Sequence, residues 1–171
     1  MPPVTVSSYS EKTSDIEAIS EVTRAAFENH PHGNQTEQYI VSALRAANAL
    51  AVSLVAQIEG QVVGHIAFSP VTISGSSCDW YGPGPISVLP DYQRQGIGQS
   101  LVNEGLRLLR ASGAKGYALA GGPDFSERFG FRSHPDLILE GVPQENFLAL
   151  PFGEEDTRGV VVFHEGFNAT E

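Results

Sequence analysis

A glycine-rich turn near the middle of the chain carries the residues best suited to binding chemistry. The spacing Gln93-x-x-Gly96-x-Gly98 follows the apolar stretch 86–89 and precedes an amphipathic segment. Glycine lets a backbone turn with no Cβ in the way, and the first turn of a helix has unpaired N–H groups at the positive end of its dipole. These features predict an anion cradle of the kind that holds a phosphate, and Arg94 adds a fixed positive charge beside it.

The segments on either side of this turn must hold it in place. After it, apolar residues recur at helical spacing and share one face: Ile97, Leu101, Val102, Leu108 and Leu109. Gly113 follows as a stop signal for that helix. Before the turn, the stretch 80–88 predicts a strand, but the segment 82–85 within it reads Gly-Pro-Gly-Pro. Because proline cannot donate to a sheet ladder, we expect this strand to be bulged or unpaired on one side.

The remainder of the chain predicts an α/β (α+β) domain built on a mixed sheet. Apolar stretches that alternate or run on indicate strands, and 3.6-residue periodicity indicates helices. The expected strands are 4–9, 50–58, 61–73, 80–88, 115–120, and a closing pair at 147–150 and 160–163; the expected helices are 13–26, 34–47, 97–110 and 124–129; and 135–146 and 151–158 are expected loops. Thr13 or Ser14 is expected to cap the first helix, and Asn34 with Glu37 to form a capping-box-like start to the second.

Composition narrows the class of protein. The chain has 171 residues, which suits a single domain spanning 1–171. Lys and Arg number 10 against 20 Asp and Glu, and the net charge of −10 argues against nucleic-acid binding while remaining compatible with an amine substrate. The single cysteine cannot form an internal disulfide, so a cytoplasmic location is expected. Neither a signal-peptide pattern nor a bilayer-length apolar run is found, and no histidine spacing predicts a metal site.

Several motifs together resemble the GNAT superfamily of N-acetyltransferases, and especially its YhbS-like branch. They are the glycine turn, the preceding Ile86-x-Val88-x-Pro90, the strand Gly64-His65-Ile66 with its proline-terminated hairpin, and Phe125-Ser126-Glu127-Arg128-Phe129-Gly130-Phe131, which is similar to the family's Tyr-x-x-x-Gly-Phe segment. The resemblance covers about 4–163. It implies the GNAT fold, with a mixed central sheet of about seven strands, about four flanking helices, and the fourth and fifth strands splayed apart.

The resemblance also implies a reaction, which is direct transfer of an acetyl group from acetyl-CoA to a primary amine of a small molecule or protein. The pantetheine arm is expected to pair with Ile86, Ser87 and Val88 in the gap between the splayed strands. The backbone N–H of Val88 is expected to polarise the thioester carbonyl as a small oxyanion hole. The pyrophosphate is expected on the amides of the glycine turn: Gln93, Arg94, Gln95, Gly96, Ile97 and Gly98.

The acid and the base of this reaction are less evident. Ser126 stands where the family often has a tyrosine that protonates the leaving thiolate. It could act through a water, the thiolate could leave without a side-chain acid, or the enzyme could be weak or inactive. The candidate bases lie on loops or strands that border the expected acceptor side: Glu37, His32, His65 and His134. Glu37 has a competing explanation as a capping residue, and His65 as a core histidine.

Two other classes of protein stay open. One is a non-catalytic coenzyme A-binding module or sensor, because the tyrosine and a carboxylate on the fourth strand are both missing. The other is a dinucleotide-binding protein, because Gly96-x-Gly98 is half of a Rossmann fingerprint, although Leu101 stands where its third glycine belongs. The sequence does not name the acceptor, and a homodimer is compatible with it.

Overall fold

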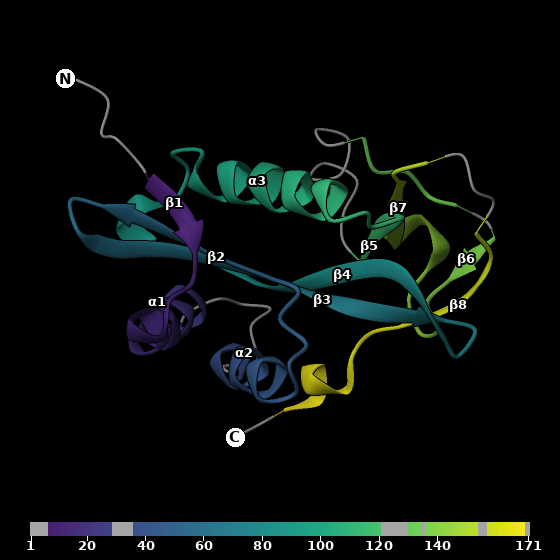
Figure 1. Cartoon of the computed structure of the whole chain (residues 1–171), viewed down its shortest axis with the longest axis horizontal. Helices are drawn as coiled ribbons and strands as arrows, with labels where there is room; N and C mark the ends of the chain where they lie inside the picture. Colours follow the sequence, from purple (N-terminus) through teal and green to yellow (C-terminus); the bar gives the residue numbers. More distant parts are fainter. Residues whose placement is uncertain (1–6, 29–35, 121–129, 135, 154–156, 170–171) are drawn as a thin grey trace.

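A twisted sheet runs through the middle of the molecule, with α3 on one face and α1 and α2 on the other (Figure 1). The computed structural model describes residues 7–28, 36–120, 130–134, 136–153 and 157–169. The strands are β1 Ser7–Ser10, β2 Val52–Ile58, β3 Gln61–Ile73, β4 Ser76–Val88, β5 Gly116–Ala120, β6 Leu137–Ile138, β7 Phe147–Pro151 and β8 Gly159–Val162. The α-helices are α1 Ile16–Phe27, α2 Glu37–Ala46 and α3 Ile97–Ala111, and short 3-10 turns cover Thr13–Asp15, Pro90–Tyr92, Gln144–Asn146 and Glu165–Asn168.

The sheet order within the described residues is β1-β2-β3-β4-β5-β7, with β8 paired to the far end of β3 and β6 paired to β8. All these pairs are antiparallel except β4 with β5 and β6 with β8. The predicted mixed sheet and α+β class are confirmed. The described part of the chain has eight strands rather than about seven, and it has three α-helices; the fourth expected helix, 124–129, lies outside the described residues. None of its helices is long and apolar enough to cross a membrane.

Some expected boundaries and pairings are wrong. The closing strands β7 and β8 do not pair with each other, since β7 pairs with β5 and β8 with β3 and β6. The segment 135–146, expected to be a loop, contains β6. Helix α2 begins at Glu37 itself with Thr36 as its N-cap, so Glu37 is not the third residue of a capping box. Thr13 and Ser14 do not cap the first helical turn, because both lie within the 3-10 turn whose N-cap is Lys12. The N–H of Lys12 donates to the carboxylate of Asp15 at 2.9 Å.

The larger core lies between α3 and the sheet. Helix α3 buries the apolar face that its periodicity predicts, with Leu101 fully covered, and Gly113 follows its end in a left-handed conformation. The ring of Phe68 of β3 packs against that of Tyr117 of β5 in this core, with the ring centroids 4.8 Å apart and the planes tilted by 53°. On the opposite face, Val55 packs with residues of α1 and α2. Both faces of the central strands are therefore covered, which explains their nearly continuous apolar sequence.

The strands β4 and β5 separate soon after they meet. They pair in parallel at Trp80 with Gly116 and at Tyr81 with Tyr117, and in the described residues β4 continues to Val88 without further pairing to β5. The splay implied by the resemblance is confirmed. It leaves one edge of the second half of β4 open.

A bulge in β4 coincides with the Gly-Pro-Gly-Pro segment. Ile66 of β3 faces Ile86, but Phe68 faces Pro83, so β4 carries one extra residue between these two pairs. The expected bulge is confirmed. An extra residue reverses which backbone N–H and C=O groups of β4 point to which neighbouring strand. The bulge therefore determines the direction of the backbone groups that follow it in β4.

Candidate functional site

The predicted anion cradle is a pocket of about 380 Å³ at the N-terminus of α3. Its lining consists of Val88, Tyr92, Gln93, Arg94, Gly96, Ile97, Gly98 and Gln99. Two of the expected residues on β4, Ile86 and Ser87, and the loop residue Gln95 do not line this pocket. The structure therefore brings together most of the loop residues that the spacing singled out.

The loop turns sharply just before the helix. Arg94 and Gly96 both have left-handed backbones, with φ of 65° and 86°. Loops with alternating left-handed residues turn their N–H groups to one side and bind anions. Ser100 donates to the carbonyl of Gly96 at 3.0 Å as the first helical bond, so the N–H groups ahead of Ser100 have no helical acceptor. The pocket thus has the donors that a phosphate requires.

Gly98 leaves room beside those donors. A Cβ built on Gly98 would have one neighbour in van der Waals range, Ile86 Cδ1 at 3.7 Å. The fold itself therefore does not need glycine at this position. Gly96 differs, because its positive φ disfavours any other residue although the space around it is open.

The glycine loop is tied to the end of β4. The side-chain amide of Gln93 donates to the carbonyl oxygen of Val88 at 2.9 Å. Arg94 is exposed, and Gln95 is exposed with its amide 3.4 Å from the carbonyl of Asp91. Gln93 is therefore the loop side chain that connects pocket and strand.

The open edge of β4 presents its backbone groups to the gap beside β5. Leu89 donates its N–H to the carbonyl of Val63 at 2.8 Å, so this pair belongs to the hydrogen-bonded set of the antiparallel ladder. Opposed pairs alternate in such a ladder, so the next pair, Gly64 with Val88, turns its polar groups away from the other strand. The N–H of Val88 accordingly points into the gap, as does that of Ile86.

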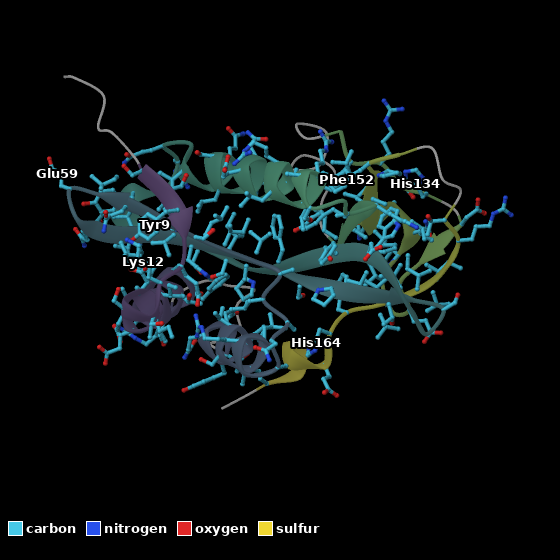
Figure 2. All side chains as sticks on the ribbon, in the orientation of Figure 1. Tyr9, Lys12, Glu59, His134, Phe152 and His164 are labelled. Atoms are coloured by element: carbon cyan, nitrogen blue, oxygen red, sulfur yellow. The ribbon has the colours of Figure 1, made fainter. Side chains whose placement is uncertain are left out.

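Of the two expected catalytic side chains, Glu37 and Ser126, the structure describes only Glu37. Ser126 and His32 lie outside the described residues. Glu37 is half-buried in the first turn of α2, on the face of the sheet opposite α3. His134 lies toward β6, at the end of the molecule far from Tyr9 and Lys12 (Figure 2). Ser87 is buried, and its side chain faces away from α3.

His65 is fully buried and belongs to a polar chain that the sequence did not reveal. Its Nε2 lies 2.8 Å from Oγ of Ser53, and the Ser53 hydroxyl contacts the carboxylate of Glu11. Arg45 donates two hydrogen bonds to the same carboxylate of Glu11, one from Nε to Oε2 at 3.0 Å and one from a terminal nitrogen to Oε1 at 2.9 Å. No local signal pairs these residues, because 42 positions separate Glu11 from Ser53.

Burial and hydrogen bonding set the charges of His65 and Glu11 in this group of hydrogen-bonded side chains. Burial lowers the pKa of His65 to about 4, so the ring is neutral near pH 7. Burial by itself would raise the pKa of Glu11, but the hydrogen bonds from Arg45 and Ser53 outweigh it and lower that pKa. Glu11 is thus an ionised carboxylate and His65 a neutral imidazole.

The described residues contain no group of three or more side chains suited to holding a metal ion.

A second pocket, of about 560 Å³, lies toward the other end of α3 and is lined by Leu108, Ser112, Glu11 and Ser53 among others. The outer end of the polar chain therefore reaches the surface.

Comparison with known proteins identifies close relatives. The chain matches the Acetyltransferase (GNAT) family over residues 16–131. It is 34% identical over 161 residues to the uncharacterized N-acetyltransferase YhbS of Escherichia coli (strain K12), covering 90% of this chain and 93% of that protein. A GNAT family acetyltransferase from Brucella melitensis, solved in complex with acetyl-CoA, superposes with a TM-score of 0.85 at 44% identity over 96% of this chain and 99% of that one. The structure of E. coli YhbS in complex with CoA gives a TM-score of 0.89 at 31% identity over 100% and 96% of the two chains.

Proposed function

Because this chain belongs to the acetyltransferase (GNAT) family, we propose that it binds acetyl-CoA at the N-terminus of α3 and transfers the acetyl group to a primary amine. The amine belongs to a small molecule or a protein. The observation that carries the proposal is the open edge of β4 beside the pocket, where the N–H of Val88 points into the gap left by β5. The relatives solved with acetyl-CoA and with CoA support it.

In this proposal the pyrophosphate lies on the backbone amides of the glycine turn, from Arg94 to Gly98, and the helix dipole stabilises its charge. The pantetheine arm pairs with the edge of β4 from Ile86 to Val88, as an extra strand would. The N–H of Val88 then stabilises negative charge on the thioester oxygen while the amine nitrogen attacks its carbonyl carbon.

The proton steps follow from the same chemistry. A primary alkyl amine is protonated near pH 7, so the nitrogen first loses one proton to become a nucleophile. The carbon–nitrogen bond then forms, the carbon–sulfur bond breaks, the nitrogen loses a second proton and the thiolate gains one. Glu37 is proposed as the group that accepts the amine proton, directly or through water, and Ser126 as the group that relays a proton to sulfur. The acidic character of the chain, with a net charge of −10, favours the approach of a cationic amine.

We further propose that residues 1–171 form one domain, that the protein is cytoplasmic, and that a homodimer is compatible with its activity. The competing function is a coenzyme A-binding module without turnover. It is favoured by the lack of a carboxylate on β4 between Ile86 and Val88.

Calorimetric titration with acetyl-CoA, CoA and NAD side by side tests the binding step. We expect acetyl-CoA and CoA to bind and NAD to give no heat of binding, whereas tight binding of NAD alone would overturn the proposal. A thiol-reactive dye then follows release of CoA in the presence of polyamines, amino acids and peptides. Binding of acetyl-CoA without amine-dependent thiol release would favour the non-catalytic module.

The catalytic candidates are tested in the same assay. Ser126→Ala and Glu37→Gln are each expected to slow amine-dependent thiol release while acetyl-CoA affinity stays within about twofold, since neither side chain is proposed to hold the cofactor. An unaltered rate in either variant would remove that residue from the mechanism.

A further inference from the structure

A row of polar side chains crosses the apolar face of the sheet beneath α1 and α2. Successive strands contribute one residue each: Ser53 from β2, His65 from β3 and Ser87 from β4. Glu11, just beyond β1, and Arg45 of α2 anchor the outer end of this row. The inner end, at Ser87, lies on the strand whose edge forms the proposed cofactor site. We call these five side chains the polar row.

The hydrogen bonds of the polar row fix the tautomer of His65. Glu11 is ionised and only accepts hydrogen bonds, so the single proton of the Ser53 hydroxyl is donated to Glu11. Ser53 Oγ, 2.8 Å from His65 Nε2, must then accept a hydrogen bond from the N–H of that nitrogen. Because the ring is neutral, Nδ1 carries no proton and is a hydrogen-bond acceptor.

Nδ1 of His65 and Oγ of Ser87 are both buried and have no hydrogen-bond partner among the described residues. The two residues face each other in the β3–β4 ladder, and side chains opposed in this way have Cβ atoms about 4.5–5.5 Å apart. A buried acceptor and a buried hydroxyl on the same face need a partner, since an unsatisfied polar group in a core costs about 1–3 kcal/mol. The Ser87 hydroxyl can supply the donor that His65 Nδ1 lacks, and His65 Nδ1 can supply the acceptor that the hydroxyl lacks.

We propose that the Ser87 hydroxyl donates to His65 Nδ1, directly or through one buried water, and that the polar row positions β4 for cofactor binding. Beyond Tyr81 the strand has lost β5 as a neighbour, so β3 alone holds its second half. A side-chain link at Ser87, between Ile86 and Val88, fixes the residues whose N–H groups face the gap. His65 and Ser87 act as positioning residues, and this inference rests on the proposed function.

The first test needs no variant and no substrate. Long-range nitrogen–proton correlation spectra of the full chain with ¹⁵N-labelled histidine report which ring nitrogen of His65 carries the proton at pH 7.5. We expect a protonated Nε2 and an unprotonated, hydrogen-bonded Nδ1. A proton on Nδ1 overturns the inference, whether or not the protein binds acetyl-CoA.

The second test uses serine-to-alanine variants of strand residues. Ser53→Ala and Ser87→Ala each break the polar row, whereas Ser69→Ala removes a hydroxyl of β3 that is as buried as that of Ser87 and is not part of the row. We expect the acetyl-CoA dissociation constant to rise about fivefold in the first two, the equivalent of one net hydrogen bond, and to stay within about twofold in Ser69→Ala.

The Val88 amide signal separates positioning from general loss of stability. Ser53 lies two strands away from Val88, so a shift of that signal in Ser53→Ala but not in Ser69→Ala supports transmission along the polar row. Equal behaviour of the two variants in both affinity and amide signal overturns it. If the wild-type protein does not bind acetyl-CoA, the proposed function fails, and the tautomer of His65 and the Val88 amide signal still decide the inference about the polar row. If a variant does not fold, the tautomer of His65 in the wild-type protein decides that inference.

Discussion

The side-chain amide of Gln93 donates to the carbonyl oxygen of Val88 across 2.9 Å, and it thereby joins the glycine turn to the open edge of β4. The two residues serve opposite ends of the proposed cofactor, the pyrophosphate and the thioester. Their contact fixes the distance between the anion pocket and the N–H that is proposed to polarise the carbonyl. A single neutral hydrogen bond of this kind contributes about 1 kcal/mol.

Gln93→Ala should therefore weaken acetyl-CoA binding about fivefold, because the loop and the strand edge lose their alignment before the cofactor arrives. Calorimetry measures the change. Gln61→Ala serves as the control, since Gln61 is exposed at the start of β3 and its loss should leave affinity unchanged. Equal affinities for the two variants would mean that Gln93 does not align the site.

Two glycines of α3 should respond to alanine in opposite ways. A Cβ on Gly98 meets only Ile86 Cδ1 at 3.7 Å, but it projects beside the proposed pyrophosphate site. A Cβ on Gly105 would lie 2.5 Å from the ring of Phe68, in the core and away from that pocket. Overpacking of this kind costs about 1–3 kcal/mol.

Gly98→Ala should thus lower acetyl-CoA affinity by about tenfold or more with little change in the free energy of unfolding. Gly105→Ala should lower the free energy of unfolding by about 1–3 kcal/mol and leave the affinity of the folded fraction intact. Urea denaturation and calorimetry on both proteins provide the comparison. If Gly98→Ala binds acetyl-CoA normally, the pyrophosphate does not approach this part of the backbone.

The features that could be predicted from the sequence are those with local causes. The glycine turn, the face of α3 and the bulge at the Gly-Pro-Gly-Pro segment each depend on residues that are near one another in the chain, and each is found in the structure. A fixed φ at proline, a positive φ at Gly96 and a 3.6-residue repeat act over a few positions whatever the rest of the fold does.

The features that could not be predicted depend on distant contacts. Glu11 and Arg45 look like ordinary surface charges in the sequence, but 34 positions apart they form the ion pair that orients Ser53. The sequence is compatible with His65 as a core histidine or as a base, and the structure gives it Ser53 as a partner on β2. The pairing of β8 with β3 likewise brings together strands that no turn connects directly.

Acid should destabilise the protein through His65. Its pKa is about 4 in the folded protein and 6.5 in the unfolded chain, so the unfolded state binds more protons between these values. Stability is therefore highest above pH 6.5 and falls as the pH drops towards 4. At 1.36 kcal/mol per pKa unit, we expect a loss of about 2 kcal/mol between pH 7.5 and pH 5.

Urea denaturation of wild type and His65→Gln at a series of pH values measures this dependence. Glutamine does not titrate, so the fall in the free energy of unfolding over this pH range should be largely absent from the variant, whatever its stability at pH 7.5. The same slope in both proteins would show that another group binds the protons. Glu11 reinforces acid loss only at lower pH, because its own pKa is lowered in the folded state.

The point where β4 and β5 part should be sensitive to a single methyl group. Gly116 pairs with Trp80 there, and a Cβ on Gly116 would lie 2.5 Å from the buried indole ring. Gly116→Ala must push the indole or β5 aside, so we expect a loss of about 1–3 kcal/mol in the free energy of unfolding together with weaker acetyl-CoA binding. Gly105→Ala, with the same size of clash but on α3, is the matched control for stability alone. A Gly116→Ala protein that is destabilised as much as Gly105→Ala yet binds acetyl-CoA like wild type would show that the junction of the two strands does not set the width of the cofactor gap.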